Sequence, residues 1–340
     1  MEKTLRYALV GCGSFGSVHL DVLTRMEGTK ITALCDLHPE SCECLRERFG
    51  LEGVPCYTDY REMLAAEKDN IDIVDVVTSD KAHCPVTLAA LDAGCHVMCE
   101  KPMSLFTEEC TAMVKKAEEK GLLLMVGQVC RCAPGFVKAK ELVETGEIGE
   151  LYFAESEYAH DYTNIKGVDN WRVDPDREPI IGGACHAIDL LRWIAGDPTD
   201  TTAYSNHKVL TDWPVDDTTV AIFRFPDQVI GKVFTSIGCK RNYTMRTVLY
   251  GTKGTIIVNN TDPVLDLYRL QPDGRSALTQ IPLEINNHNV MEEHRLLREA
   301  VLYGTPLVTT GTEGARTVAV CRAVVESAET GKPVEIAYPV

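Results

Sequence analysis

The first residues that could carry chemistry are glycines near the N-terminus, in the run GCGSFG. This run fits G-x-G-x-x-G, follows the strand-like segment YALV and opens a segment with helical periodicity. In that context the glycines permit a tight turn, close approach of a pyrophosphate to the backbone, and close packing of helix on strand. The pyrophosphate would lie at the positive end of the helix. We therefore expect a dinucleotide to contact Gly11, Gly13, Ser14, Phe15 and Gly16.

An acid in the next strand-like run refines this prediction. Asp36 ends the run TALCD, about 20 residues beyond Gly16. A carboxylate at this place accepts hydrogen bonds from the adenosine ribose and repels a 2′-phosphate, which favours NAD over NADP. Two alternatives stay open: Asp36 could instead cap the following helix, and His38 with its loop could tolerate NADP.

Two further residues are suited to moving a proton. Lys101 follows a buried-looking strand and precedes a proline, at the carboxyl edge of the predicted sheet, where open α/β folds bind ligands. His186 belongs to the residue type whose ordinary pKa, about 6.5, suits exchange near neutral pH. Either residue could therefore hold or move a proton in a reaction at such a site.

The elements that position these residues follow from the hydrophobic pattern. Short apolar runs alternate with helical patterns over residues 1–127, which is typical of a doubly wound parallel sheet and predicts a Rossmann dinucleotide-binding domain. Strands are expected at Tyr7–Val10, Ile31–Cys35, Ile73–Val77, His96–Cys99 and Leu122–Val126. Helices are expected at Ser17–Met26, Pro39–Phe49, Tyr60–Ala66, Cys84–Ala93 and Thr107–Lys120.

The pattern changes over residues 128–340, for which we expect a second α/β domain. Successive strands punctuated by the turns PDQ and GTKG predict an antiparallel or mixed sheet. A loop rich in Asp, Pro and Gly spans residues 161–178. Strand-like segments are expected at Leu151–Tyr158 and within Thr201–Val258. Helices are expected at Gly135–Glu144, Ala184–Ala195, Val290–Tyr303 and Thr312–Glu329.

Composition excludes several classes of protein. The formal net charge of −16 argues against nucleic acid and against anionic membranes as partners. No apolar run approaches the roughly 20 residues that span a bilayer, and the N-terminus has no signal-peptide pattern, so we expect a cytoplasmic protein. The 14 cysteines do not form paired C-x-x-C knuckles; we expect no metal site and mostly buried thiols.

Four segments together resemble the Gfo/Idh/MocA family of oxidoreductases, and the resemblance covers nearly the whole chain. They are Gly11–Gly16 with His19 following, Thr78–Pro102 ending in Glu-Lys-Pro, Gly183–Trp193, and Tyr250–Ile256. The resemblance implies a Rossmann domain, then an α/β domain with a large open, mostly antiparallel sheet that often mediates oligomerisation, so a homodimer or homotetramer. It also implies NAD-dependent dehydrogenation of a CH–OH group on a sugar or polyol bound between the domains.

The resemblance also assigns residues. Thr78, His83 and Glu100 are expected beside the nicotinamide half of the cofactor, and Lys101 is also expected to contact the cofactor. Lys101 and His186 are expected to act on the reacting hydroxyl. Because hydride removal from an alcohol carbon requires the hydroxyl proton to leave, we assign His186 as acid or base and Lys101 as the group that stabilises the alkoxide, with the reverse assignment open. Two substrate contacts, His160 and Tyr243, follow from the same similarity. Trp171 and Arg172 are two further candidate substrate contacts, because tryptophan offers a face for stacking and arginine offers a bidentate hydrogen-bond donor. Ordinary packing or surface roles are equally compatible with these four contacts.

One departure from the family pattern bears on mechanism. Many members have an aspartate four residues before the histidine, where this chain has Gly182. Without that aspartate, proton transfer depends more on Lys101. Asp189, one helical turn after His186, remains a candidate to orient the His186 ring. Arg131 is expected to support the crossover between domains. Two other functions stay open: an NAD-retaining enzyme that cleaves glycosides by oxidation, elimination and reduction, and a non-catalytic sugar or dinucleotide sensor.

Overall fold

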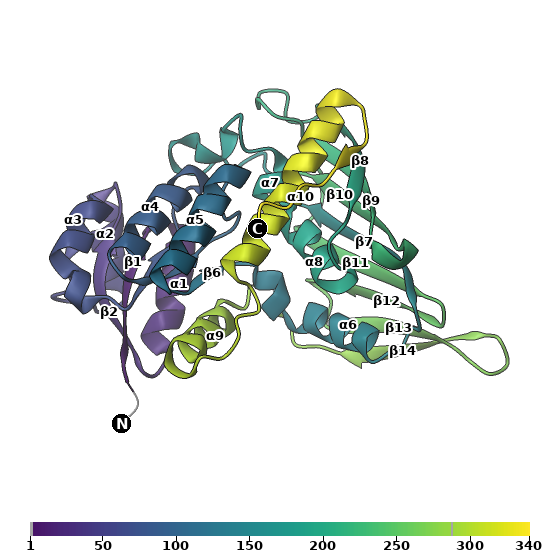
Figure 1. Cartoon of the computed structure of the whole chain (residues 1–340), viewed down its shortest axis with the longest axis horizontal. Coiled ribbons are helices and arrows are strands. Elements are labelled where there is room, and N and C mark those ends of the chain that lie inside the picture. The colour runs from purple at the N-terminus through teal and green to yellow at the C-terminus, as the bar shows by residue number, and fades with distance from the viewer. Residues whose placement is uncertain (1–2, 287) are drawn as a thin grey trace. The chain divides into compact units, whose positions relative to one another are not determined.

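The computed structural model describes residues 3–286 and 288–340, and the chain divides into two compact units (Figure 1). Unit 1 comprises residues 1–128, 290–316 and 339–340, and unit 2 comprises residues 129–289 and 317–338. Residues 290–316, expected in the second domain, thus belong to unit 1. The reason is apolar burial: Leu297 of this segment lies in the same hydrophobic cluster as Leu5, Leu9 and Leu20.

Unit 1 is built on a six-stranded parallel sheet with the order β3-β2-β1-β4-β5-β6. The strand order reverses between β1 and β4, and this switch point is where doubly wound folds bind ligands. The strand β3 was not expected, because two residues are too short to show a hydrophobic period. The strands are β1 Leu5–Val10, β2 Thr29–Cys35, β3 Cys56–Tyr57, β4 Ile73–Val76, β5 His96–Cys99 and β6 Leu124–Val126.

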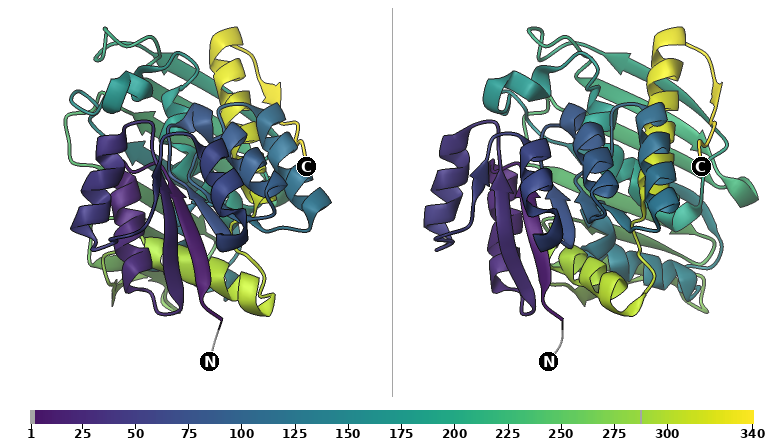
Figure 2. Two further views of the ribbon diagram at one scale, coloured as in Figure 1. Left: turned by 90° about the vertical axis from the view of Figure 1, so that its left-hand side faces the viewer. Right: turned by 60° about the vertical axis from the view of Figure 1, so that its left-hand side comes forward.

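Helices flank this sheet, as the two views of Figure 2 show. Right-handed crossovers place the helices after β1 and β2 on one face, and those after β3, β4 and β5 on the other. A helix from late in the chain, α9, packs beside α1. The helices are α1 Ser14–Arg25, α2 Pro39–Arg48, α3 Tyr60–Glu67, α4 Asp80–Asp92, α5 Thr107–Lys120 and α9 Val290–Tyr303.

Unit 2 is built on a nine-stranded sheet with the order β14-β13-β12-β11-β7-β10-β9-β8-β15. The neighbours β7 and β10 are parallel, and the other neighbouring pairs are antiparallel. The strands are β7 Leu151–Ala159, β8 Asp200–Asn206, β9 Thr218–Arg224, β10 Ile230–Ser236, β11 Thr244–Gly251, β12 Gly254–Asn259, β13 Val264–Leu270, β14 Ser276–Pro282 and β15 Val334–Glu335.

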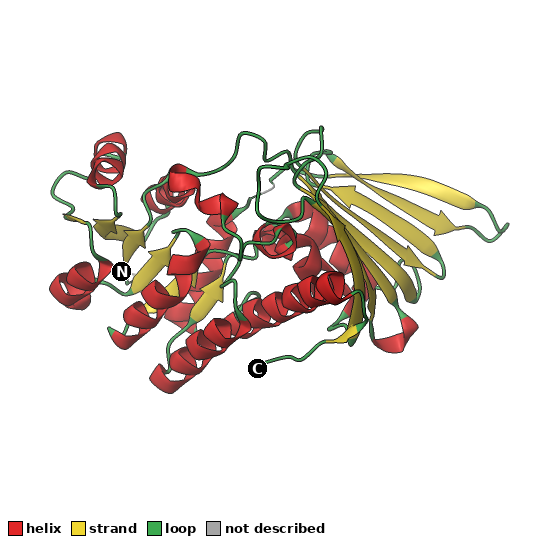
Figure 3. Cartoon of the chain, turned by 90° about the horizontal axis from the view of Figure 1, so that it is seen from above, coloured by secondary structure: helices red, strands yellow, loops and turns green. Residues whose placement is uncertain are grey.

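One face of this sheet is covered by helices and the other is open (Figure 3). The alternation along β9 records the two faces, since Ala221 and Phe223 are buried while Val220 and Ile222 are exposed. The helices of unit 2 are α6 Pro134–Glu144, α7 Pro179–Gly182 and α8 Cys185–Ala195, and α10 Gly311–Thr330 begins in unit 1 and ends in unit 2. Nowhere in the described ranges is a helix long and apolar enough to cross a membrane.

Candidate functional site

The glycine loop of unit 1 lies at the carboxyl end of β1. Gly11 has φ of +104°, and a side chain there would collide with the carbonyl of Val77. A side chain at Gly16 would collide with the carbonyl of Gly11, so helix α1 and its strand approach closely. At Gly13 the direction of a side chain is open, with no atom within 4 Å among the described residues. Gly11 therefore permits the tight turn, Gly13 leaves room for a pyrophosphate to approach the backbone, and Gly16 allows the helix to pack closely on the strand, as a pyrophosphate site requires.

The next two residues begin the helix. Ser14 is the first residue of α1 and is exposed, as an amide and hydroxyl facing a bound phosphate would have to be. Phe15 is half-buried, and its ring lies 5.1 Å from the ring of His19 in an edge-to-face arrangement. The start of α1 is therefore fixed from its buried side while its amides face outward.

Asp36 is held beside this loop. One carboxylate oxygen accepts a 2.7 Å hydrogen bond from the backbone amide of Cys12, and the other accepts a 2.9 Å bond from that of His38. Asp36 is half-buried at the end of β2, and each of its oxygens keeps a lone pair for a further donor. The predicted residues of the adenosine and pyrophosphate halves thus come together and fit a dinucleotide.

The Glu-Lys-Pro segment follows β5. Glu100 is 6% exposed, and one of its oxygens accepts a 3.1 Å hydrogen bond from the backbone amide of Lys101. Burial by itself would raise the pKa of Glu100, but His19 and then Lys101 outweigh it and hold the pKa below its ordinary value. Lys101 is half-buried.

The neighbouring residues Thr78 and His83 support this segment. His83 is 1% exposed; its Nδ1 lies 2.8 Å from the carbonyl oxygen of Pro102, and its Nε2 lies 3.2 Å from that of Thr78. His83 therefore links the backbone that follows β4 to the backbone that follows β5 through its two ring nitrogens. The backbone of Thr78 in turn adjoins Gly11. Direct contact of Thr78, His83 and Glu100 with nicotinamide stays a prediction.

A buried polar cluster lies behind Glu100, and sequence reasoning did not find most of it. Nδ1 of His19 is 2.9 Å from a carboxylate oxygen of Asp75, and Nε2 of His294 is 3.4 Å from the same oxygen. These three side chains have no exposed surface and meet the spacing of a metal site. Asp75 sits inside an apolar run and His294 comes from α9, so no local motif pointed to either residue.

Three predicted residues of unit 2 gather around an unpredicted tyrosine, Tyr158. The ring of His186, near the start of α8, stacks on Tyr158 at 6.3 Å. The hydroxyl of Tyr158 lies 3.3 Å from Nδ1 of His160, and the rings of His160 and Tyr243 are 4.6 Å apart. The ring of His288 lies 6.4 Å from that of His186. The structure therefore brings His160, His186 and Tyr243 together.

Tyr158 is placed by its neighbours. A side chain at Gly183 would press into its ring, so glycine is needed there. The hydroxyls of Tyr158 and Tyr162 are 2.8 Å apart. Burial raises the pKa of Tyr158 and of Tyr243 well above the ordinary value, so both stay neutral phenols that can donate and accept hydrogen bonds.

Trp171 and Arg172 lie in a separate turn of unit 2, the 3₁₀ segment Val168–Val173. The guanidinium of Arg172 lies 4.2 Å from the ring centre of Trp171, and that of Arg177 lies 5.0 Å from it. The expected stacking surface and donor are thus in contact with each other. Whether they also bind substrate stays a prediction.

The position of the missing aspartate is filled by Arg177. A side chain at Gly182 would collide with its guanidinium, and Arg177 donates a 2.9 Å hydrogen bond to the carbonyl oxygen of Gly182. A buried cation thus stands where many family members carry an anion. In the sequence, the glycine at position 182 was a sign of this difference.

The candidate for orienting His186 has other partners. Asp189 is fully buried, and its two oxygens accept hydrogen bonds of 2.8 and 2.7 Å from Arg131. Thr317 donates a further 2.9 Å bond to it. Arg131 is thus half of a bidentate ion pair inside unit 2, and Asp189 serves that pair.

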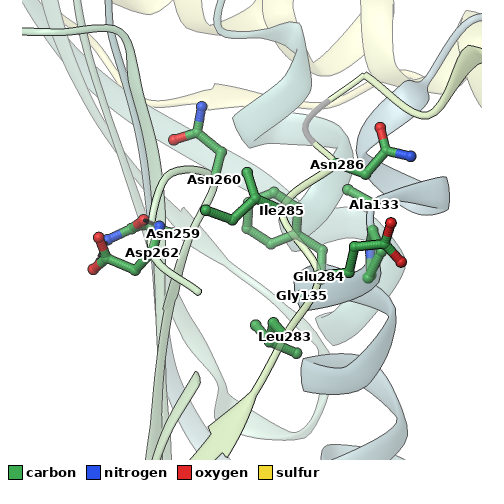
Figure 4. A pocket seen from close by; sticks show the side chains of 11 residues that line it. Ala133, Gly135, Asn259, Asn260, Asp262, Leu283, Glu284, Ile285 and Asn286 are labelled. Atoms are coloured by element: carbon green, nitrogen blue, oxygen red, sulfur yellow. Dashed lines mark hydrogen bonds between the residues drawn. The ribbon is translucent and has the colours of Figure 1, made fainter. Parts of the chain in front are cut away.

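A small pocket of unit 2 lies apart from these residues (Figure 4). It is formed by the start of α6, the turn after β12 and the segment after β14. Its volume of about 10 Å³ admits about one water molecule, so it is no sugar site. Its lining includes Gly135, Asn260, Asp262, Leu283 and Asn286.

Comparison with known proteins agrees with this geometry. The family model described as "Oxidoreductase family, NAD-binding Rossmann fold" matches residues 5–128, and that of the GFO/IDH/MocA C-terminal domain matches residues 136–257. The chain is similar to a myo-inositol 2-dehydrogenase of Thermotoga maritima, with 26% identity and 98% of each chain covered. It is also similar to a D-apiose dehydrogenase of Paraburkholderia graminis, with 25% identity over 98% of this chain and 90% of the relative.

A solved structure shows the same fold throughout. The structure of a levoglucosan dehydrogenase in complex with NADH and L-sorbose superimposes with a TM-score of 0.88 at 23% identity, covering 99% of this chain and 100% of the other. The two family matches occupy both units and include the glycine loop, the Glu-Lys-Pro segment and the helix of His186. This chain belongs to the Gfo/Idh/MocA family of oxidoreductases, and its first unit carries the NAD-binding Rossmann fold of that family.

Proposed function

We propose that this oxidoreductase transfers hydride between NAD and a secondary hydroxyl of a sugar, sugar derivative or inositol. The proposal is carried by two sets of residues, one in each unit. Lys101 stands on a buried, charged support at the carboxyl edge of the parallel sheet. His186 stands within a cluster of phenol and imidazole groups suited to a ligand rich in hydroxyls. Relatives named for inositol and apiose support this substrate class.

The residues of unit 1 hold the cofactor. Gly13 and the first turn of α1 receive the pyrophosphate, and Asp36 accepts from the adenosine ribose. The carboxylate of Asp36 favours NAD over NADP by repelling a 2′-phosphate. Bound nicotinamide supplies the hydride acceptor or donor. Thr78 and Glu100 border the remainder of the site.

The proton is handled by Lys101 and His186. His186 accepts the hydroxyl proton in the oxidative direction and returns it in the reductive one, since imidazole is an effective base near neutral pH. Lys101, protonated, stabilises negative charge on the oxygen as the proton leaves. His160 and Tyr243 bind the other hydroxyls. Asp189 does not take part in this proton transfer, because its carboxylate is used by Arg131.

The test is a substrate panel with matched variants. NADH formation is measured with inositols, hexoses, sugar acids, glycosides and nucleotide sugars, for the wild type, Lys101→Ala and His186→Ala. We expect one substrate class to give turnover, with kcat falling at least about 100-fold in both variants while NADH binding persists. Lys253→Ala and His207→Gln, outside the proposed site, serve as controls.

Other results would point elsewhere. Glycoside cleavage with no net NADH release would indicate the NAD-retaining enzyme. Intact NAD binding with no turnover across the panel would indicate a sensor. Turnover that survives both substitutions would contradict the roles given to Lys101 and His186. Greater activity with NADP than with NAD would contradict the role given to Asp36.

A further inference from the structure

We propose that His19 is a positioning residue for the reaction: it bridges the carboxylates of Asp75 and Glu100 inside unit 1, and so fixes Glu100 against the backbone that carries Lys101. The inference rests on the proposed function of Lys101 and adds His19 and Asp75, to which that function assigns no role.

The geometry of His19 shows the bridge. Its side chain has no exposed surface. Nδ1 lies 2.9 Å from an oxygen of Asp75, and on the opposite side of the ring Nε2 lies 3.4 Å from an oxygen of Glu100. A neutral imidazole has one N–H and can donate to only one carboxylate. A carboxylate facing each of the two ring nitrogens favours the imidazolium form, which is positive and carries an N–H on both sides.

The charges around His19 balance in that form. Burial lowers the pKa of His19, but Asp75 and then Glu100 outweigh it and raise the pKa to about 10. Lys101 lies on the Glu100 side, and burial with the nearby Glu100 raises the pKa of Glu293 well above its ordinary value. A positive His19 and Lys101 offset a negative Asp75 and Glu100, and Glu293 adds no charge when it is protonated. His294 faces Asp75 and His19 from α9.

Glu100 is restrained on each of its sides. One oxygen faces His19 at 3.4 Å, and the other accepts the 3.1 Å bond from the amide of Lys101. The carboxylate lies so close to Gly127 that a side chain there would meet its oxygen at 2.5 Å. The backbone after Lys101 is held by His83 through the carbonyl of Pro102. The base of the lysine side chain is therefore fixed from two directions.

The far end of the bridge is anchored by the late helix α9. Nε2 of His294 lies 3.4 Å from the same Asp75 oxygen and 3.2 Å from Nδ1 of His19. This explains why residues 290–316 belong to unit 1. The helix supplies the residue that completes the support of Asp75.

Loss of His19 should act on rate and leave cofactor binding intact. Without the imidazolium, buried Glu100 loses the positive charge that faces one of its oxygens and keeps the hydrogen bond from the Lys101 amide, so it either takes up a proton or turns towards the lysine ammonium. Both responses displace Lys101. A displacement of about 1 Å in a reacting group can slow a reaction about 100-fold.

The first experiment is a double-mutant cycle in the full-length protein. We expect His19→Gln and Glu100→Gln each to lower kcat about 10- to 100-fold, and we expect His19→Gln, which lies outside the proposed cofactor contacts, to change KM and the NADH dissociation constant less than about 3-fold. We expect the double variant to be no slower than Glu100→Gln alone. His207→Gln is the control for a histidine substitution. Multiplying effects on kcat, or an unchanged kcat in His19→Gln, would overturn the proposal, whatever happens to the melting temperature.

The second experiment needs no substrate. In protein labelled with ¹⁵N-histidine, the signals lost in His19→Gln report the protonation of His19. We expect both ring nitrogens to remain protonated up to about pH 9. A neutral ring at pH 7, or stoichiometric metal in the purified protein bound by His19, Asp75 and His294, would overturn the bridge. Failure of the substrate panel alone would instead overturn the proposed function.

Discussion

At the scale of single residues, the packing of Arg177 restricts which residue can stand at position 182. The guanidinium of Arg177 occupies the space into which any side chain at Gly182 would project. We expect Gly182→Val, whose apolar side chain cannot pair with the guanidinium, to lower the melting temperature by several degrees, since about 1–3 kcal/mol of strain follows when a well-packed site is overfilled. Thermal denaturation of the purified variants measures this.

A double variant separates crowding from other causes. Gly182→Val combined with Arg177→Ala should recover part of the lost melting temperature, because the space is vacated. Ala184→Ser, on the same turn, is a control for a small substitution near α8. A single variant as stable as wild type would contradict the packing described here.

Glu178 makes stability depend on pH. Burial, and then Asp216, raise the pKa of Glu178 from its ordinary value to about 7. An unfolded glutamate titrates near 4.3, so between these two values the folded chain binds more protons and stability falls as pH rises. We expect the free energy of unfolding of Glu178→Gln to equal that of the wild type near pH 4. Near pH 8 we expect it to be about 1 kcal/mol higher than that of the wild type, after allowing for solvent screening. Urea denaturation at both values tests this, and an equal difference at both would contradict it.

What sequence could reveal at this scale depended on distance along the chain. The roles of Gly11, Gly16 and Asp36 follow from neighbours within one βαβ unit, and a local motif carries them. His294 reaches Asp75 only through the folding of α9, and no local pattern encodes such a contact.

At the scale of elements, α8 is anchored by a buried ion pair. Asp189 and Arg131 are almost fully buried and share two hydrogen bonds. Removing one partner strands the other charge in a medium of low dielectric constant. We expect Asp189→Ala to lower the free energy of unfolding by about 3–5 kcal/mol. Asp200→Ala, which breaks the exposed pair with Arg224, should cost less than about 1 kcal/mol. Equal costs in chemical denaturation would contradict this.

The elements themselves were largely predictable, because their apolar periods are clear. The helix Val290–Tyr303 has the bounds that the sequence indicated. Its membership of unit 1 was not predictable, because periodicity shows which face is apolar and does not show which core will cover it. The strand β3 was not predicted, because its two residues are too few to show a hydrophobic period.

At the scale of the whole molecule, the open face of the unit 2 sheet exposes apolar side chains. Tyr204 is 75% exposed and Ile222 is 53% exposed, and Tyr204 lies opposite Val220 on the neighbouring strand. Several large apolar side chains on one exposed face commonly mark a protein interface. With a net charge of −16 on each chain, long-range repulsion opposes association, so any contact between copies would have to come from such an apolar surface.

We therefore expect the chain to form a homodimer or homotetramer through this face. Light scattering on a sizing column should give a multiple of 37.6 kDa for the wild type. Ile222→Asp should shift the mass towards the monomer, because a charge in the middle of an apolar contact is costly to bury. Tyr303→Asp, an exposed apolar residue of unit 1, should leave the mass unchanged. A monomeric wild type at micromolar concentration, or an Ile222→Asp variant that keeps the wild-type mass, would show that other chemistry covers this face.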